Sequence, residues 1–292
     1  MDKKSFAKEL RRFLSGDMKD EILERLDGLE DFRTMPNSEY DLFGASRETL
    51  ANLLPLAAFF YKFYFRTEVC GLENVAGLKR GLITPNHMVQ IPVDGMNICM
   101  ALFMEPEKPR FVRGVGHTAL AKQPFMSKLV SRSGQVIGTP ENTDRLFAED
   151  NLVLIFPEGI GAVRPYSRRY RLSEFHVGFM EYAIEFSYPV VPTAVIGSEE
   201  STLVLANVKA LSGFMNIQRF VLTPTFPWLG PLGALPYPAK FRIHFGEPMD
   251  FSMHKDKLNK PDEIRGLVEL VRQRVQQMLD RDLAGLPKFP FF

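Results

Sequence analysis

The chain has 292 residues, of which 45% are hydrophobic and 24% charged, and its formal net charge is only +1. A chain of this length buries most of its apolar surface without disulfide or metal support, and this composition excludes extensive disorder. The near-neutral charge gives no electrostatic reason to bind nucleic acid.

Residues 1–66 are predicted to form a helical, membrane-proximal segment. Apolar residues recur at helical spacing through residues 1–33, and MDKKSFAKELRRFL lacks the continuous apolar core of a signal peptide. After the turn-rich MPNSEYDLFG, Ser46 and Thr49 are placed to begin an apolar helix. That helix includes LANLLPLAAFFYKFYF, residues 50–65, which is too short and too interrupted to span a membrane. Because it is apolar nearly all round, we expect it to be buried either in protein or in lipid, and its aromatic rings favour a membrane interface.

From about residue 67, short β-like runs alternate with helical stretches. The runs are TEVCGL (67–72), GLITPN (81–86), RFVRGV (110–115), QVIGT (135–139), LVLIFPEG (152–159), PVVPTAVIG (189–197) and KFRIHFGEP (240–248). Helices are predicted at 94–104, 118–132, 142–149, 173–186 and 261–283. This alternation predicts an α/β domain over residues 67–292, in which a mostly buried mixed sheet is flanked by helices.

Residues 220–241 interrupt the alternation. Five prolines exclude both a helix interior and a central strand, so an extended, kinked loop is predicted around the only tryptophan, Trp228. An apolar loop needs a partner. The candidates are the protein's own core, a pocket beneath the loop, another subunit and a bilayer.

The stretch GLITPNHMVQIPVDG, residues 81–95, contains a candidate general base. In a continuous helix, His87 and Asp94 would lie about 10.5 Å apart, too far for a direct hydrogen bond. Pro92 suits the first turn of a helix, and a bend at 88–91 would fold the Asp94 carboxylate back against the imidazole. Asp94 would then fix the tautomer of His87 and leave its other ring nitrogen free as a base. The alternative is that the two residues are unrelated.

A second candidate lies in LVLIFPEGI, residues 152–160. A buried strand delivers Pro157, Glu158 and Gly159 to its carboxyl end, where ligands bind to open α/β sheets. The alternative is a strand-terminating turn with a solvated carboxylate. No metal site is predicted, because Cys70, Cys99 and the other histidines lack partners at metal-ligand spacing.

Together these motifs resemble the glycerolipid acyltransferases, which include the glycerol-3-phosphate and lysophosphatidate acyltransferases. The resemblance covers residues 67–250. Its elements are Asn86, His87 and Asp94, then Phe156, Pro157, Glu158 and Gly159, and then the apolar strand 190–197 with Pro192. It implies that His87 deprotonates an acceptor hydroxyl, which attacks a thioester directly. Glu158 and Gly159 would position the acceptor, and Asn86, Phe156, Pro157 and Pro192 would also belong to the substrate-binding set. No Gly-x-Ser-x-Gly nucleophile elbow is present.

Two features depart from the family pattern. The step from His87 to Asp94 is longer than usual and includes Pro92, which indicates a divergent branch. In GQVIGTPEN, residues 134–142, Pro140 stands where family members with phosphorylated acceptors carry an arginine. A lysolipid with another head group, or a neutral glyceride, is therefore the expected acceptor.

Two groups of cations fit the phosphates of coenzyme A, an acidic carrier protein or anionic lipid head groups. One group follows the Phe-Pro-Glu-Gly motif and the other precedes GQVIGT. The alternative to a binding role is that these cations lie on ordinary solvated helix faces. Arg113, Arg164 and Arg168 are assigned to substrate binding. The groups are Arg164, Arg168, Arg169 and Arg171, and Lys108, Arg110, Arg113, Lys122, Lys128 and Arg132.

The sequence thus predicts an O-acyltransferase of lipid metabolism, located peripherally on the cytoplasmic side of a membrane. Acyl-CoA or an acyl-carrier protein would be the co-substrate, no other cofactor or metal is expected, and the partner is a membrane lipid surface. Two alternatives remain: a non-catalytic lipid-binding protein on the same fold, and a thioesterase that uses the same dyad on water.

Overall fold

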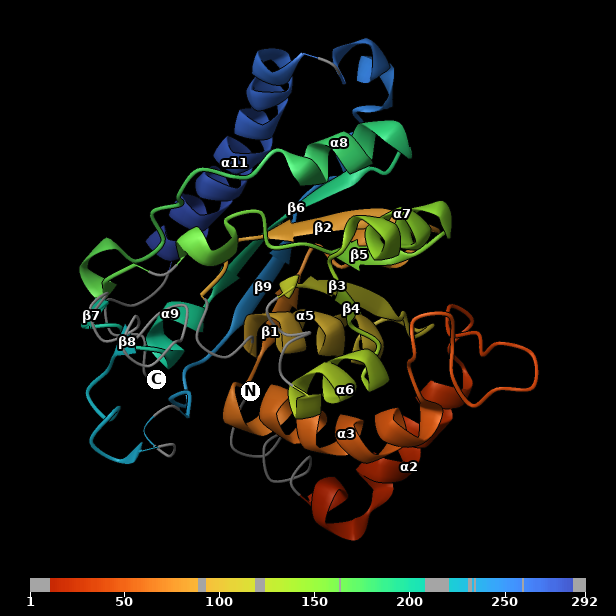
Figure 1. Ribbon diagram of the computed structural model, residues 1–292. Helices are drawn as coiled ribbons and strands as arrows, with labels where there is room; N and C mark the ends of the chain where they lie inside the picture. The colour runs from red at the N-terminus through yellow and green to blue at the C-terminus, as the bar shows by residue number, and fades with distance from the viewer. Residues whose placement is uncertain are drawn as a thin grey trace.

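The computed structural model describes residues 11–88, 93–118, 124–162, 164–207, 221–230, 233, 235–258 and 260–285. Its centre is a seven-stranded sheet in the order β1-β9-β6-β2-β5-β3-β4, and β7 and β8 form a separate pair (Figure 1). Each of the seven predicted β-like runs contributes one strand to the central sheet. The strands are β1 (Glu68–Cys70), β2 (Gly81–Pro85), β3 (Val112–Gly116), β4 (Val136–Ile137), β5 (Leu152–Leu154), β6 (Val190–Ile196) and β9 (Arg242–Phe245).

The sheet is mixed, as predicted. β2 lies at its centre and pairs in parallel with β5 and β6, so that Ile83 is in register with Leu154 on one side and with Val191 on the other. β9 runs antiparallel to β6. The remaining pair is β7 (Ala206–Asn207) and β8 (Val221–Leu222), and β8 occupies the start of the predicted kinked loop.

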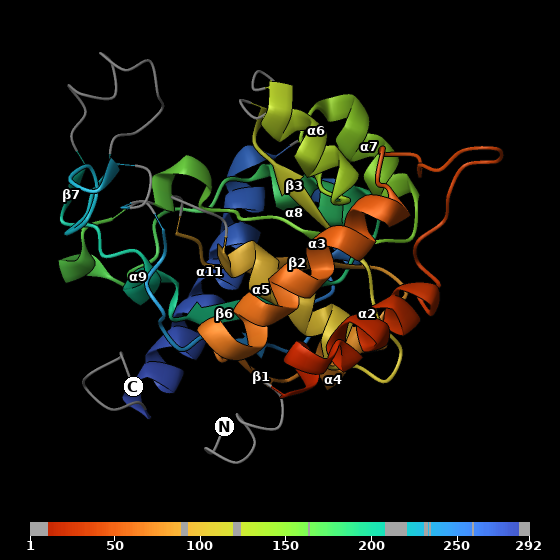
Figure 2. The same cartoon turned by 90° about the horizontal axis from the view of Figure 1, so that it is seen from below.

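Helices cover both faces of the sheet (Figures 1 and 2). Successive β2 residues point to opposite faces: Ile83 joins the core that contains α2, α3 and α5, and Leu82 joins the core that contains α7, α8 and α11. The predicted fold class is confirmed. The α-helices are α2 (Asp17–Asp27), α3 (Arg47–Phe59), α4 (Glu73–Ala76), α5 (Val93–Met104), α6 (Pro124–Arg132), α7 (Pro140–Ala148), α8 (Gly178–Glu185), α9 (Ser198–Ser201) and α11 (Pro261–Ala284).

One predicted helix begins later than expected. α8 begins at Gly178 rather than at residue 173, because the preceding backbone donors serve tertiary partners: Ser173 N–H donates to Glu158 and His176 N–H to the Pro157 carbonyl. The helix predicted at 118–132 is described from Pro124 as α6, and residues 119–123 lie outside the described part of the chain. The described residues also contain short turns of 3₁₀ helix, which include η3 (Gly159–Ala162), η4 (Tyr166–Arg168) and η6 (Ser252–Lys257).

The apolar N-terminal helix forms as predicted. The Ser46 side chain accepts a hydrogen bond from the backbone N–H of Thr49, 3.4 Å away, and caps α3, which continues into a π-helical turn, η1 (Phe60–Tyr64). One side of this helix, including Leu50 and Tyr61, is buried in the core that also contains α5, whereas Leu56 is 57% exposed. None of the described helices is long and apolar enough to cross a membrane.

Candidate functional site

The candidate site lies where three parallel strands end. β5, β2 and β6 are neighbours, and their carboxyl ends meet at one edge of the sheet. From β2 the chain passes to α5 on one face of the sheet, and from β5 it passes to α8 on the other. Adjacent strands whose connections leave to opposite faces form a topological switch point, which is where open α/β sheets bind ligands.

The structure brings His87 and Asp94 together at this edge. The Nδ1 atom of His87 lies 2.8 Å from Oδ2 of Asp94, which is fully buried in the first turn of α5. The same carboxylate accepts hydrogen bonds from the backbone N–H groups of Met88 and Gly95, and the imidazole stacks on Phe156 with ring centroids 3.9 Å apart. A carboxylate can only accept at this contact, so in a neutral imidazole it favours the tautomer with the proton on Nδ1 and the lone pair on Nε2. The His87 side chain is 12% exposed.

The path between the two residues is only partly described. The bend was expected at 88–91, ahead of Pro92, and residues 89–92 lie outside the described ranges. α5 begins at Val93, so Asp94 occupies a first-turn position, where the helix N-terminus stabilises a carboxylate.

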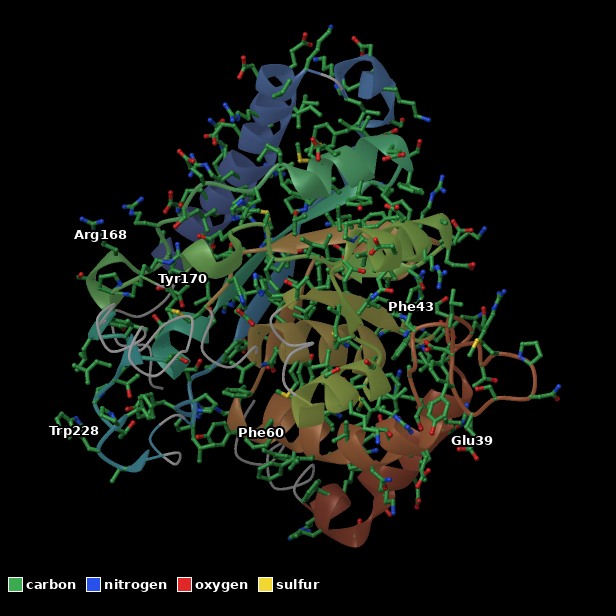
Figure 3. The ribbon with its side chains drawn as sticks, viewed as in Figure 1. Glu39, Phe43, Phe60, Arg168, Tyr170 and Trp228 are labelled. Carbon is green, nitrogen blue, oxygen red and sulfur yellow. The ribbon has the colours of Figure 1, made fainter. Side chains whose placement is uncertain are left out.

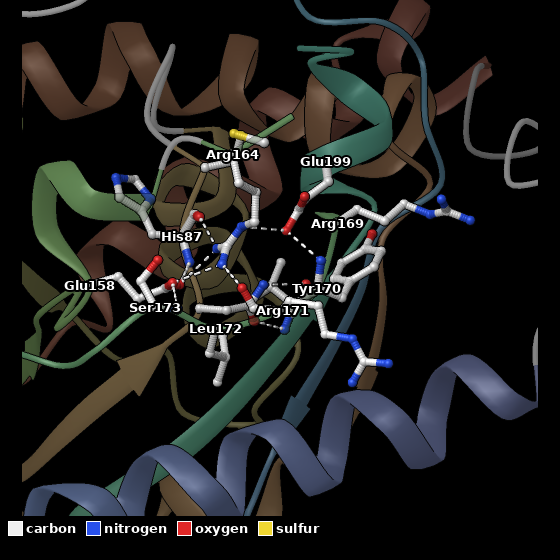
Figure 4. Close-up of polar contacts among 12 residues, drawn as sticks. His87, Glu158, Arg164, Arg169, Tyr170, Arg171, Leu172, Ser173 and Glu199 are labelled. Atoms are coloured by element: carbon white, nitrogen blue, oxygen red, sulfur yellow. Dashed lines mark hydrogen bonds and ion pairs between the residues drawn. The ribbon is translucent and has the colours of Figure 1, made fainter. Parts of the chain in front are cut away.

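Glu158 holds the main chain of His87 (Figure 4). Its Oε1 accepts hydrogen bonds from His87 N–H at 3.2 Å and Arg164 Nη2 at 3.0 Å, and its Oε2 accepts from Arg164 Nη1 at 2.9 Å and Ser173 N–H at 2.8 Å. Nη2 of Arg164 also donates to the His87 carbonyl at 3.2 Å, and Nη1 donates to the carbonyl of Arg171. Glu158 and Arg164 therefore contact the main chain of His87 from both its donor and its acceptor side.

Gly159 meets a steric requirement beside Glu158. Its φ of +52° lies in the left-handed region, and an added Cβ would lie 3.2 Å from Cδ2 of His176. Glycine is the residue that accepts both conditions at little cost. Pro157, the residue before Glu158, is buried.

Asn86 joins β2 to β6 just before His87. Its side-chain oxygen accepts from Val195 N–H at 2.7 Å and its side-chain nitrogen donates to the Val195 carbonyl at 2.9 Å. Pro192 lies in β6, in register with Thr84 of β2, and its carbonyl accepts from Gly246 N–H. Both residues, which were assigned to substrate binding, have contacts that order the strands carrying the site.

Arg113 and Arg168 are not brought beside His87. Arg113 is buried on β3, two strands away from β2, where it pairs with Asp41, donates to the Gly134 carbonyl and lies 4.3 Å from the ring centroid of Phe111. Arg168 is exposed on η4, and Figure 3 shows it at the outer edge of the molecule.

Other cations of the second group also pair with the N-terminal segment. Lys108 contacts Glu30 at 3.0 Å, and Arg110 contacts Asp31 at 2.6 Å. Lys122, from the same group, lies outside the described residues. Within the described residues, no cluster of His, Cys, Asp or Glu side chains is suited to hold a metal ion.

Sequence reasoning missed two buried carboxylates, Glu199 and Glu200, in the short helix α9 that follows β6. Oε1 of Glu199 accepts from Tyr170 N–H at 2.8 Å and lies 3.2 Å from Nε of Arg164, while the Tyr170 hydroxyl donates to Glu200. Burial raises the pKa of Glu199 to about 7, against the opposing effect of Arg164. Two glutamates directly after the carboxyl end of an apolar strand were the available signal.

Comparisons with known proteins show what this chain is similar to. Residues 66–196 match the family model Acyltransferase. An uncharacterized protein of Mycobacterium tuberculosis (strain ATCC 25618 / H37Rv) is 35% identical over 234 residues, which cover 79% of this chain and 65% of that protein. An uncharacterized protein of Mycobacterium leprae (strain TN) is 34% identical over 240 residues, which cover 80% of this chain and 65% of that protein. The chain thus spans less than two thirds of the length of these relatives.

The fold is also similar to that of a solved structure, the crystal structure of the 1-acyl-sn-glycerophosphate (LPA) acyltransferase PlsC from Thermotoga maritima. The match covers 97% of this chain and 95% of that chain, with 16% sequence identity and a TM-score of 0.49. The family resemblance predicted from the sequence is confirmed by the match of residues 66–196.

Proposed function

We propose that this chain, which carries an acyltransferase-family segment at residues 66–196, transfers a fatty acyl group from a thioester to a lipid hydroxyl. The donor would be acyl-CoA or an acyl-carrier protein, and the acceptor a lysophospholipid or glyceride. The observation that carries the proposal is the 2.8 Å contact between His87 Nδ1 and Asp94 Oδ2 at the strand edge next to Glu158. A base oriented in this way is what direct acyl transfer requires.

In the proposed mechanism, Nε2 of His87 accepts the proton of the acceptor hydroxyl while the hydroxyl oxygen bonds to the thioester carbonyl carbon. The carbon–sulfur bond then breaks, and the imidazolium returns the proton to the leaving thiolate. Asp94 stabilises the imidazolium through Nδ1 and keeps the reactive tautomer. No acyl-enzyme and no redox cofactor takes part.

The expected acceptor is not a glycerol phosphate. Pro140, which replaces the arginine of family members with phosphorylated acceptors, is the first residue of α7 and follows the capping residue Thr139. Arg113 and Arg164 are buried and already paired, with Asp41 and Glu158 respectively. These pairings favour a lysolipid with another head group, or a neutral glyceride.

The proposal is tested with a labelled acyl thioester and a panel of lipid acceptors. His87→Ala should abolish acyl transfer. His244→Ala is the matched control, because His244 also contacts a carboxylate, Asp282 at 2.7 Å, and should retain transfer. Transfer that survives in His87→Ala would contradict the mechanism. Acyl release in the absence of an acceptor would favour the thioesterase alternative. Lipid binding without turnover would favour the non-catalytic lipid-binding alternative.

We also propose that the chain contacts the cytoplasmic surface of a membrane peripherally, through the loop at 223–239. The tip of this loop exposes 75% of Trp228 and 60% of Leu229. The loop is held close to the carboxyl end of β6, because Tyr237 N–H donates to the carbonyl of Ser201 in α9 at 2.7 Å. An aromatic and a leucine at an exposed tip suit the boundary between lipid head groups and acyl chains.

A further inference from the structure

We infer that Glu158 is a positioning residue for His87 and does not contact the acyl acceptor. The inference rests on the proposed function, since it concerns the same site. It departs from the role that the family resemblance gives to Glu158, which is to position the acceptor directly.

The Glu158 carboxylate has no free capacity for a substrate hydroxyl. A carboxylate has about four acceptor sites on its two oxygens. Four N–H groups occupy them: His87 N–H and Arg164 Nη2 on Oε1, and Arg164 Nη1 and Ser173 N–H on Oε2. The side chain is also fully buried. An acceptor would have to displace one of these donors and enter a space that the protein already fills.

His87 needs support from Glu158 because it lies beyond the last residue of β2, Pro85. Its N–H therefore donates to Glu158 instead of to a strand partner, and its carbonyl accepts from Arg164. Arg164 and Glu158 form a two-pronged ion pair, a geometry that fixes both planar groups in one orientation. The pair fixes the main chain of His87, while Asp94 and Phe156 fix its ring.

Steady-state kinetics distinguish a Glu158 that positions His87 from a Glu158 that binds the acceptor. Glu158→Gln keeps the size of the side chain but loses the charge and one acceptor oxygen. If Glu158 positions His87, kcat should fall at least about tenfold, since a displacement of 1 Å can cost about 100-fold. The KM for the acceptor should stay within about twofold of wild type. A tenfold rise in the acceptor KM at unchanged kcat would overturn the inference.

Two further variants sharpen this test. Glu158→Asp keeps the charge on a shorter side chain, so its kcat should lie between those of wild type and Glu158→Gln. Glu200→Gln is the matched control, because Glu200 is also a buried glutamate but bonds Tyr170 rather than His87. Its kcat should stay within about twofold of wild type. An equal loss in Glu200→Gln would mean that buried charge, and not the contact with His87, is responsible.

A measurement without turnover distinguishes this inference from the proposed function. The Nδ1 proton between His87 and Asp94 should give a downfield proton NMR signal in wild type and Glu200→Gln, and the signal should be absent in His87→Ala. In folded Glu158→Gln, confirmed by its thermal transition, this signal should broaden through exchange with water. An unchanged signal would overturn the positioning role whether or not the protein transfers acyl groups.

Discussion

At the scale of single residues, Asp94 determines which nitrogen of His87 is free. An asparagine at this position would have the same size, but its amide N–H₂ group can donate to Nδ1 and would favour the opposite tautomer, with the proton on Nε2. We therefore expect Asp94→Asn to lower kcat about 10³- to 10⁴-fold with little change in KM. Asp282→Asn, which alters the second His–Asp contact, should leave kcat unchanged. Equal kinetics for the two variants would rule out the assigned role of Asp94.

Glu199 should make folding stability depend on pH. Burial raises the pKa of its carboxyl from 4.5 in the unfolded chain to about 7 in the folded chain. Between these values the folded state binds more protons than the unfolded state, so this group lowers stability as the pH rises from about 4.5 to about 7. Glu199→Gln should remove this contribution. The free energy of unfolding, measured by urea denaturation, should therefore exceed that of wild type by more at pH 8 than at pH 5. The same difference between Glu199→Gln and wild type at both pH values would contradict the role of Glu199.

The sequence predicted that the candidate residues at strand ends lie close together, but it could not predict the partners of the arginines. His87 and Glu158 follow buried strands, and parallel neighbours end at one edge, so their proximity could be predicted. The environment of Arg113 depends on Asp41, which is 72 residues away in the sequence. Arg164 likewise contacts Glu199, which lies beyond β6. Local charge counts contain no information on such distant partners.

At the scale of elements, the hydrophobic pattern predicted each strand of the central sheet and the long helices. Its predictions were least accurate at the ends of these elements. The start of α8 illustrates the reason. The residues from Ser173 to His176 were expected to form the first turn of this helix. Instead, the N–H groups of Ser173 and His176 donate to the Glu158 carboxylate and the Pro157 carbonyl. Tertiary hydrogen bonds thus compete with the first turn of a helix, and single-sequence patterns do not include them.

The segment before α3 should be held to β3 by one buried ion pair. Oδ1 of Asp41 accepts from the N–H groups of Phe43 and Ala45, and Oδ2 pairs with Arg113. Asp41→Asn keeps the first two bonds and leaves the Arg113 charge unpaired. Breaking one side of a buried pair typically costs about 3–5 kcal/mol, and we expect a loss of that size in the free energy of unfolding.

A double variant checks this interpretation of the Asp41–Arg113 pair. Arg113→Met removes the unpaired positive charge and keeps an apolar side chain of similar length. Asp41→Asn combined with Arg113→Met should recover more than half of the loss, as replacement of both partners usually does. If the double variant is as unstable as Asp41→Asn alone, the unpaired charge does not cause the loss of stability. The loss would then come from weaker hydrogen bonds in the turn that Asp41 begins.

At the scale of the whole molecule, residues 11–66 belong to the same apolar core as one face of the sheet. Met18, Ile22 and Leu50 pack in the cluster that contains Ile83 and Val191. Deletion of the N-terminal segment would expose that face, so a change in membrane partition after the deletion could reflect unfolding. Surface substitutions that leave both cores intact are therefore the better test of membrane binding.

The exposed loop tip should carry much of the affinity for lipid. Burying a leucine-sized side chain contributes about 1.5–3 kcal/mol, and about 1.4 kcal/mol corresponds to a tenfold change in partition. Trp228→Ser with Leu229→Ser should therefore lower binding to phosphatidylglycerol vesicles, measured by sedimentation, at least about tenfold. Met253→Ser is the matched control, since Met253 is 79% exposed but lies on η6, which packs beside α8 and far from β8 and the loop that follows it (Figure 1). It should bind like wild type. An equal decrease in both proteins would indicate nonspecific apolar adsorption, and no decrease in either would exclude the loop as the contact.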